Sequence, residues 1–187
     1  LNTSQSPQVS VIIPVFNHID ETVRCLTAIA TTIEKTSYEV IIADDGSTDS
    51  TQRLLSRNPS LRYLRNPSPL GFLQNCNGAA KTAKGDYLVL LNNDTEVTGG
   101  WLDNLLQTFR DLPSAGLVGS MLIYPDGRLQ EAGGVIWRDG SGMNFGRFDD
   151  PERPEYNYLR DVDYCSGASV MVPRALWQQL GGFDEHY

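Results

Sequence analysis

The chain has 187 residues, of which 40% are hydrophobic and 20% charged, and its formal net charge at pH 7 is -8. This length and composition are typical of one globular domain with a sizeable core. The acidic balance argues against a broad basic face for nucleic acid. No apolar run approaches the roughly 18 residues that a membrane-spanning helix needs.

The cysteines and the first residues indicate the cellular compartment in which the protein acts. Cys25, Cys76 and Cys165 lie far apart and form no CxxC pair, which argues against a zinc site. Free thiols are typical of a reducing cytosol. Residues 1–8 are polar and contain no signal-peptide apolar stretch and no initiator Met. We therefore expect a cytoplasmic protein that is an excised piece of a longer chain with other domains.

The first elements in chain order alternate between strand and helix. Residues 9–15 form an apolar run rich in β-branched side chains, which predicts a strand, and residues 38–43 predict a second one. Between them, apolar residues recur at helical spacing and predict one buried helix face. Those residues are Leu26, Ile29, Ala30 and Ile33.

The next stretch predicts a capped helix, a strand and a longer helix. Asp49 and Gln52 have the spacing of a capping box, which predicts a helix through Leu54 and Leu55. Residues 61–64 predict a third strand. A helix is then expected over residues 70–84, with Gly85 as its C-cap.

A fourth strand and a further helix complete the first half. Residues 87–91 are nearly all apolar, and Thr98 is placed to cap the next helix. Its predicted buried face comprises Trp101, Leu102, Leu105, Leu106 and Phe109. The alternation predicts an α/β fold with a mostly parallel sheet, helices on both faces and right-handed crossovers.

The pattern changes after Pro113. Short strands are expected within residues 116–124, 133–137 and 168–172. The polar stretch 138–160 is too long for an inert connection and is expected to be a mobile substrate loop. A last helix is expected from Arg174 to Leu180, after Pro173 and before Gly181-Gly182. We expect a single domain in two parts, residues 1–112 and residues 113–187, with a smaller mixed sheet in the second part.

Polar clusters follow three of the predicted parallel strands. They are Pro14-Val15-Phe16-Asn17, Asp44-Asp45 and Asn92-Asn93-Asp94. Ligands of open parallel sheets bind beyond the carboxyl ends of the strands, so these clusters are expected to meet at one rim.

Asp94 is the candidate metal ligand of this rim. A carboxylate at the end of a strand buried on both faces needs a partner, and Mg²⁺ is typically held by one or two carboxylates with phosphates and water. Such a cation would also let an acidic protein bind a diphosphate. The alternative, in which Asp94 only begins a turn after Asn92 and Asn93, has equal weight from position alone.

The other polar candidates are weaker. Asp44 or Asp45 could accept a hydrogen bond from a base or a ribose, although Asp-Gly-Ser is also strong turn chemistry, which is favoured when the pair is taken alone. Asp161 and Asp163 have the spacing of a DxD motif, but the more favoured interpretation is that they are exposed acids at the start of a strand. His18 and His186 are interpreted as solvated.

Several other classes lack their motifs. No GxGxxG, GxxxxGK[ST] or GxSxG sequence is present. A receiver-like signalling domain needs a lone phospho-acceptor Asp after a later strand and a following Lys, which Asn92-Asn93-Asp94 fits badly. A nucleotidyltransferase needs a Gly-rich loop with Arg or Lys after the first strand, and Phe16-Asn17-His18 is not such a loop.

Taken together, the motifs resemble those of family-2 glycosyltransferases of the GT-A fold, with similarity over nearly the whole chain. The resemblance rests on four segments in order: VSVIIPVFN (9–17), VIIADDGSTDST (40–51), NPSPLGFLQNCNGAAKTAKGDYLVLLNND (66–94) and GGFDE (181–185).

The resemblance implies a nucleotide-binding half, residues 1–112, an acceptor-side half, residues 113–187, and roles for individual positions. Asp94 would be the ligand of a divalent cation, Mg²⁺ or Mn²⁺, and Asp44 or Asp45 would bind the base, with its neighbour near the ribose. Ser166, Gly167 and Ala168 would face the sugar and the acceptor. The nucleotide pocket would be formed by Pro14, Val15, Phe16, Asn17, Asp44, Asp45, Gly71, Phe72, Asn77, Asn92 and Asn93.

Two departures from the family pattern matter. Asn92 stands where the family's DxD element has its first carboxylate, which resembles the NND branch that includes rhamnosyltransferase-like enzymes of bacterial surface polysaccharides. The family's general base comes from an acidic pair shortly after GGFDE, and the chain ends at Tyr187 before such a pair. Asp184 and Glu185 are the remaining candidates, although they resemble the preceding element.

The resemblance implies an inverting, metal-dependent transfer from a UDP- or dTDP-sugar to a glycan or lipid-linked acceptor, with peripheral membrane contact if the acceptor is lipid-linked. If the base is absent, the chain is expected to bind the donor but to transfer sugar poorly. The alternative is a nucleotide-sugar-binding segment of a larger protein without catalysis of its own.

Overall fold

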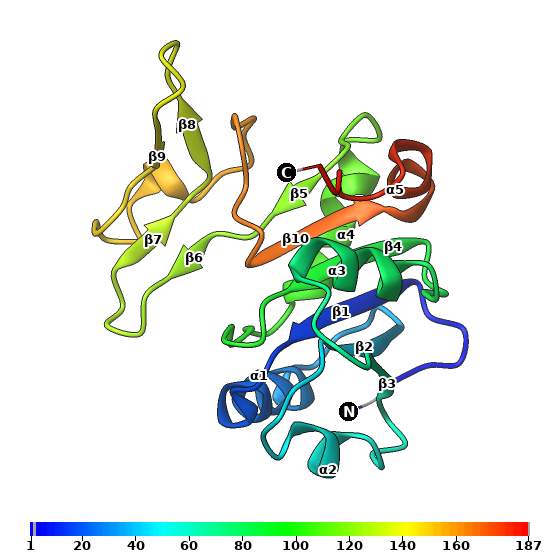
Figure 1. The fold of residues 1–187 in the computed structure, drawn as a ribbon. Coiled ribbons are helices and arrows are strands. Elements are labelled where there is room, and N and C mark those ends of the chain that lie inside the picture. The colour runs from blue at the N-terminus through cyan, green and yellow to red at the C-terminus, as the bar shows by residue number, and fades with distance from the viewer. Residues whose placement is uncertain (2, 187) are drawn as a thin grey trace.

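A computed structural model describes residue 1 and residues 3–186, and its centre is a six-stranded sheet (Figure 1). The strand order is β3-β2-β1-β4-β10-β5. The first four strands are parallel, and β10 runs antiparallel to both of its neighbours. The strands are β1 (Val9–Val15), β2 (Tyr38–Asp44), β3 (Arg62–Arg65), β4 (Tyr87–Leu91), β5 (Val118–Gly119) and β10 (Ser169–Pro173).

Helices cover both faces of this sheet, as the continuous apolar strands predict. The helices are α1 (Ile19–Thr31), α2 (Thr51–Leu55), α3 (Phe72–Ala80), α4 (Trp101–Asp111) and α5 (Arg174–Leu180). Residues of α1, α2 and α4 pack with alternate strand residues such as Val11 and Ile13 in one core cluster. Residues of α3 and α5 pack with Ile12 and its neighbours in the other. The α/β fold and the mostly parallel sheet are therefore confirmed.

The second half is organised differently from the expectation. Its strands β5 and β10 complete the main sheet, and α5 covers one face of it. In place of one small mixed sheet there are two antiparallel pairs, β6 (Leu122–Ile123) with β7 (Leu129–Glu131) and β8 (Gly134–Ile136) with β9 (Gly142–Asn144). Together with the 3-10 turn Pro154–Tyr156, these pairs form a hairpin unit that projects from the main body (Figure 1).

The stretch 138–160, expected to be a long loop, is partly ordered by local contacts. It contains β9 and the 3-10 turn. The ring of Phe145 lies edge-on to Tyr156 at 5.2 Å, and the Arg160 guanidinium lies 3.8 Å from the centre of the Phe145 ring. Aromatic and cation–π contacts of this kind need no periodic apolar pattern, so periodicity could not predict them.

The buried face of α1 differs from the predicted one. Leu26 and Ile29 are buried, but Ala30 is exposed and Ile33 lies beyond the end of the helix with 89% of its surface exposed. Thr22 and Cys25 complete the buried face instead. The spacing of apolar residues did not predict this face correctly, because small polar and thiol side chains also pack well beneath a helix.

The role predicted for Gly85 was also wrong. The helix α3 ends at Ala80, and Gly85 approaches the start of β1, where its N–H donates to Ser10 Oγ at 2.9 Å. A Cβ on Gly85 would lie 2.6 Å from the Ser10 nitrogen. Glycine is therefore required here for close contact between two backbone segments, not for a helix cap.

The predicted caps of α2 and α4 are replaced by neighbouring residues. Ser50 is the N-cap of α2, while Asp49 accepts hydrogen bonds from the N–H and hydroxyl of Thr51 without forming a reciprocal box. Gly100 is the N-cap of α4, and Thr98 contributes only its backbone carbonyl to the N–H of Trp101.

Within the described residues, no helix is long and apolar enough to span a bilayer.

Candidate active site

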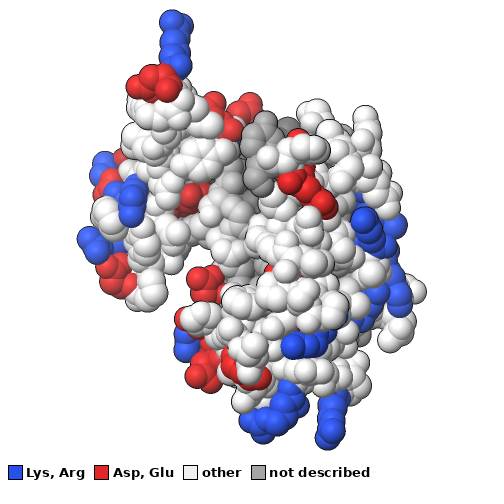
Figure 2. All heavy atoms as spheres, viewed as in Figure 1, with Lys and Arg blue, Asp and Glu red and all other residues white. Residues whose placement is uncertain are grey.

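The strand ends do meet at one rim, as the topology predicts. Val15, Asp44 and Arg65 are successive partners across β1, β2 and β3. On the other side of β1, the Asn92 N–H after β4 donates to the Ala168 carbonyl before β10 at 2.9 Å. Figure 2 shows a hollow between the main body and the hairpin unit on this side, with acidic side chains at its borders.

Asn17 joins the first two strand ends. Its side-chain oxygen accepts the N–H groups of Thr48 at 2.7 Å and Asp49 at 3.2 Å, and its own N–H donates to Ser47 Oγ at 2.8 Å. Its backbone is left-handed, with φ of 61°. Asn17 therefore shapes the rim by tying two loops together, and its side-chain oxygen is occupied by these contacts.

Asp44 is fully buried and accepts hydrogen bonds from three residues of the rim. It accepts the Ser47 N–H at 2.8 Å, the Arg65 guanidinium at 2.5 Å and the Tyr63 hydroxyl. Burial favours a higher pKa of this carboxyl, but the bonds from Ser47, Tyr63 and Arg65 outweigh it and hold the pKa of Asp44 below its usual range. Asp44 is thus an ionised structural group.

Asp45 holds the loop in front of α3. Its Oδ1 accepts Asn66 Nδ2 at 2.8 Å and the Leu70 N–H at 2.9 Å, and its Oδ2 accepts the Gly71 N–H at 2.9 Å. With 6% of its surface exposed, it is the more accessible residue of the pair. Its Oδ2 has one donor and a remaining lone pair, so Asp45 is better placed than Asp44 to accept a bond from a base.

The segment after β4 carries the carboxylate expected to bind metal. Asn93 Nδ2 donates to Thr22 Oγ1 of α1 at 3.0 Å, which anchors the segment. Asp94 is exposed and makes no hydrogen bond or ion pair with any residue that the structure describes. Burial, helped by the nearby charges of Asp94 and Glu96, raises the pKa of Cys25 to about 12. Negative charge therefore gathers at this end of the rim.

These residues fit a weakly held divalent cation. No group of three or more His, Cys, Asp or Glu side chains able to hold a metal occurs among the described residues. Asp94 supplies one unpaired carboxylate, and the Asn92 and Asn93 amides add neutral oxygens at most. An ion held by one carboxylate must take its other ligands from phosphate and water, which is usual for Mg²⁺.

The apolar members of the predicted pocket lie at two corners of the rim. Phe16, directly after β1, has 51% of its surface exposed, and Phe72, at the start of α3, has 46%. Pro14 and Val15 are more buried and belong to the strand itself. Gly71 is the N-cap of α3, with φ of 89°, so its N–H can turn toward Asp45. Exposed aromatic rings beside a polar rim suit a flat base.

Asn77, expected to border the nucleotide cleft, binds the GGFDE segment, residues 181–185. Its side chain donates to the Phe183 carbonyl at 2.9 Å and to Glu185 Oε1 at 3.2 Å, and accepts the Phe183 N–H at 2.9 Å. Phe183 in turn lies 5.9 Å from the Phe72 ring. The GGFDE segment is thereby held against α3, at the Phe72 corner of the rim.

The two candidate catalytic residues of that segment have structural partners. Glu185 is tied to Asn77. Hydrogen bonds from the His186 N–H and imidazole lower the pKa of Asp184, which weakens it as a base. The acidic pair expected as the base would follow Tyr187, which lies outside the described residues.

The segment expected to face the sugar is placed by the hairpin unit. The Ser166 N–H donates to Glu131 Oε1 at 2.9 Å, and the Ala168 N–H donates to Ser166 Oγ at 3.3 Å. A Cβ on Gly167 would meet no atom within 4 Å, so open space lies beside it. Through the bond from Asn92 to Ala168, this segment borders the Asn92-Asn93-Asp94 cluster.

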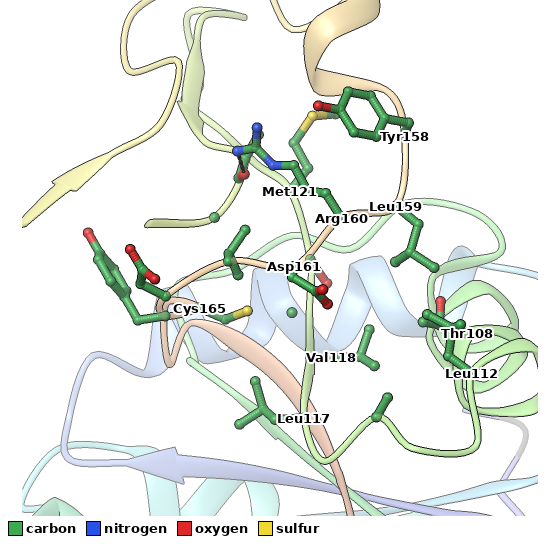
Figure 3. A pocket seen from close by; sticks show the side chains of 18 of the residues that line it. Thr108, Leu112, Leu117, Val118, Met121, Tyr158, Leu159, Arg160, Asp161 and Cys165 are labelled. Carbon is green, nitrogen blue, oxygen red and sulfur yellow. Dashed lines mark hydrogen bonds between the residues drawn. The ribbon is translucent and has the colours of Figure 1, made fainter. Parts of the chain in front are cut away.

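A separate pocket of about 860 Å³ lies along β5, away from the rim residues (Figure 3). Its lining includes Leu117, Val118, Leu159 and Asp161. Asp163 accepts the Ile136 N–H at 2.8 Å, and its neighbour Tyr164 forms an isolated bridge with Gly134 of β8. Asp161 and Asp163 are exposed as expected, but the prediction that they start a strand was wrong, because β10 begins only at Ser169.

Three contributors to the rim were missed from the sequence. Tyr63 and Arg65 bind Asp44, and Glu131 binds Ser166. The first two lie on a four-residue strand whose positions are all half-buried, so only the strand order reveals that they reach the rim. Glu131 lies in a three-residue strand, where no periodic signal can develop.

Comparison with known proteins adds a family and a fold. The model of the family "Glycosyl transferase family 2" matches residues 10–176. An O-antigen biosynthesis protein, RfbC of Myxococcus xanthus, is 32% identical over 193 residues, which cover 97% of this chain and 15% of that protein. An N-acetylglucosaminyl-diphospho-decaprenol L-rhamnosyltransferase of Mycobacterium tuberculosis is 29% identical over 171 residues, covering 79% of this chain and 56% of that enzyme.

Solved structures agree on the fold. A mannosyltransferase of Pyrobaculum calidifontis in complex with GDP-Man and Mn²⁺ superposes with a TM-score of 0.68 and 21% identity, covering 98% of this chain and 50% of that one. TarS of S. aureus in complex with UDP gives a TM-score of 0.68 and 22% identity over 96% of this chain and 51% of that one. The chain thus spans about half or less of the length of these relatives.

Proposed function

This chain belongs to glycosyl transferase family 2, and on that premise we propose that it moves a sugar from a nucleoside-diphosphate sugar to a hydroxyl of a glycan or lipid-linked acceptor, with inversion at the anomeric carbon. The observation that carries the proposal is the unpaired Asp94 carboxylate at a rim shared with Asp45 and two exposed aromatic rings. A base, a diphosphate and a cation would each find a suitable group there.

The described residues divide the work of donor binding. Asp45 Oδ2 accepts a hydrogen bond from the base, whose faces lie against Phe16 or Phe72. The Asn17, Asp44 and Asn66 contacts keep the loops of this pocket in place before the donor arrives. Asp94 would hold a divalent cation, which would supply positive charge to neutralise the departing diphosphate.

The acceptor side is the segment Ser166–Ala168 beneath the hairpin unit. Gly167 is exposed and Ala168 is bonded to Asn92, so we infer that the sugar of the donor and the attacking hydroxyl meet beside this segment. Holding two reactants in line supplies much of the rate enhancement in such a transfer. A general base must still remove the hydroxyl proton, and neither Asp184 nor Glu185 is presented for that task.

Relatives narrow the substrates and the setting that we propose. O-antigen biosynthesis and a decaprenyl-diphosphate-linked acceptor, named for two relatives, favour bacterial surface polysaccharide and a lipid-linked acceptor. A dTDP- or UDP-sugar with Mg²⁺ or Mn²⁺ is the donor we infer. Three free cysteines suit a reducing compartment, which supports action in the cytoplasm, at the inner face of the membrane.

Transfer assays on the protein test the proposal. Labelled dTDP-rhamnose, UDP-glucose and UDP-N-acetylglucosamine are supplied with Mn²⁺ and a polyprenyl-diphosphate-linked sugar. We expect one donor to give a labelled lipid product, and Asp94→Ala to abolish it while Asp161→Ala does not. Equal activity of Asp94→Ala and the wild-type protein would refute the assignment of the donor site.

A further inference from the structure

Glu131 is a buried carboxylate that the donor site does not use. It ends β7, with 2% of its surface exposed, and its Oε1 accepts the Ser166 N–H at 2.9 Å. No cation or second donor contacts it within the described residues. Its Oε2 has no donor, yet it is not among the oxygens closed off from solvent, as Glu34 Oε1 is.

The other buried carboxylates are compensated in full. Glu39 accepts Ser10 Oγ at 2.7 Å, the Lys84 N–H at 2.8 Å and the Arg62 guanidinium at 2.7 Å. Asp44 and Asp45 likewise have three donors each. Burying an ionised carboxylate costs several kcal/mol unless hydrogen bonds or a cation offset it. Glu131, with one donor, departs from the pattern of this molecule.

The position of Glu131 connects it with the proposed sugar site. Bonds run from Glu131 to Ser166, from Ser166 Oγ to the Ala168 N–H, and from the Ala168 carbonyl to the Asn92 N–H. The open space beside Gly167 is part of this segment. Glu131 and Asn92 are thus bonded to the two ends of one three-residue segment, 166–168, whose central Gly167 is exposed.

We propose that Glu131 Oε2 binds a hydroxyl of a sugar ring, and that Glu131 is thereby a sugar-binding residue of the acceptor-side pocket. The proposal rests on the function proposed above. A hydroxyl is the ligand that fits, because it donates one hydrogen bond, carries no charge that would repel the acidic rim and can replace the missing donor. The hydroxyl belongs to the transferred sugar or to the acceptor sugar.

The test compares Glu131→Gln and Glu131→Ala with a control, Gln130→Ala, in the full-length protein. Gln130 is the half-buried neighbour in β7, and its side chain makes no hydrogen bond or ion pair with any residue that the structure describes. Affinities for UDP and UDP-glucose, and for dTDP and dTDP-rhamnose, are measured with Mn²⁺, followed by the KM of the polyprenyl-linked acceptor. Melting curves establish that each variant is folded.

We expect Glu131→Ala to lose at least tenfold in affinity for the sugar and to leave free nucleotide affinity within twofold, as loss of a bond to a charged group predicts. Glu131→Gln should lose less, and Gln130→Ala should match the wild type. If the donor supplies the hydroxyl, the nucleotide-sugar affinity falls; if the acceptor does, its KM rises.

Two results would overturn the inference. One is unchanged nucleotide-sugar affinity and acceptor KM in folded Glu131→Ala. The other is an equal loss for free nucleotide and nucleotide sugar, which would assign Glu131 a purely structural task. A wild-type protein that binds no nucleotide would instead refute the proposed function itself.

Discussion

Adjacent carboxylates of the rim differ in what surrounds them, and this difference assigns their tasks. Asp44 is buried and hydrogen-bonded to Tyr63 and Arg65. Asp45 has one oxygen with a remaining lone pair, and Asp94 has no hydrogen-bond or ion-pair partner among the described residues. The sequence predicts all three as candidates from their place after strands, but it cannot rank Asp44 against Asp45. That ranking depends on β3, whose Arg65 lies opposite Asp44 in register.

Protonation of Asp44 should contribute to the fall in the free energy of unfolding at acid pH. Its pKa is lowered in the folded protein, so its contribution is present above the unfolded value of about 3.9 and is lost as pH falls through the lower folded value. Asp44→Asn should cost about 3 kcal/mol at pH 7, because Arg65 loses its buried partner. Urea unfolding between pH 7 and pH 3 measures both effects.

In that experiment the variant should lose less stability on acidification than the wild type. Asp126→Asn is the control, because Asp126 pairs with Arg128 at an exposed position where ion pairs contribute little. Parallel pH profiles for wild type and Asp44→Asn would show that Asp44 is not the group responsible.

Asp45 should act on nucleotide binding more than Asp44 does. In Asp45→Asn, an NH₂ group would face one of the donors from Asn66, Leu70 or Gly71, and the oxygen offered to a base would lose its charge. We expect UDP or dTDP affinity to fall at least tenfold. If titration calorimetry finds the larger loss in Asp44→Asn among variants that remain folded, the two assignments must be exchanged.

At the scale of elements, strands were predictable and helix ends were not. Residues 9–15 and 87–91 are apolar on both faces, which is the pattern of buried parallel strands, and β1 and β4 have these bounds. The ends of α1, α3 and α4 depend on tertiary contacts that local propensity does not contain. Gly85 illustrates this, because it lies against Val9 and Ser10 at the start of β1.

A pair of glycine substitutions separates those two influences. Gly85→Ala should destabilise the fold by about 1–3 kcal/mol, since its Cβ would lie 2.7 Å from the Val9 carbonyl carbon. Gly78 occupies an exposed position of helix α3, and no atom lies within 4 Å of where its Cβ would be. Gly78→Ala should therefore stabilise the fold by about 0.5–1 kcal/mol. Urea unfolding measures both, and equal effects of the two substitutions would contradict the contact seen at Gly85.

At the scale of the molecule, the first half follows from the sequence and the second does not. Long periodic segments predict the parallel sheet and its rim, and four motifs in order indicate the family. The hairpin unit is built from strands of two or three residues and from contacts such as Phe145 with Tyr156 and Arg160, which leave no periodic pattern. The task of Glu131 is therefore visible only in the folded chain.

The most direct test of the central claim is calorimetric titration of UDP and dTDP into this protein with and without Mn²⁺. Wild type and Asp94→Ala are compared, with Asp161→Ala as the matched carboxylate control. We predict that one nucleotide binds, that Mn²⁺ tightens binding at least tenfold in the wild type and in Asp161→Ala, and that this gain is absent in Asp94→Ala. Equal metal-dependent binding in Asp94→Ala and wild type would contradict the proposed donor site.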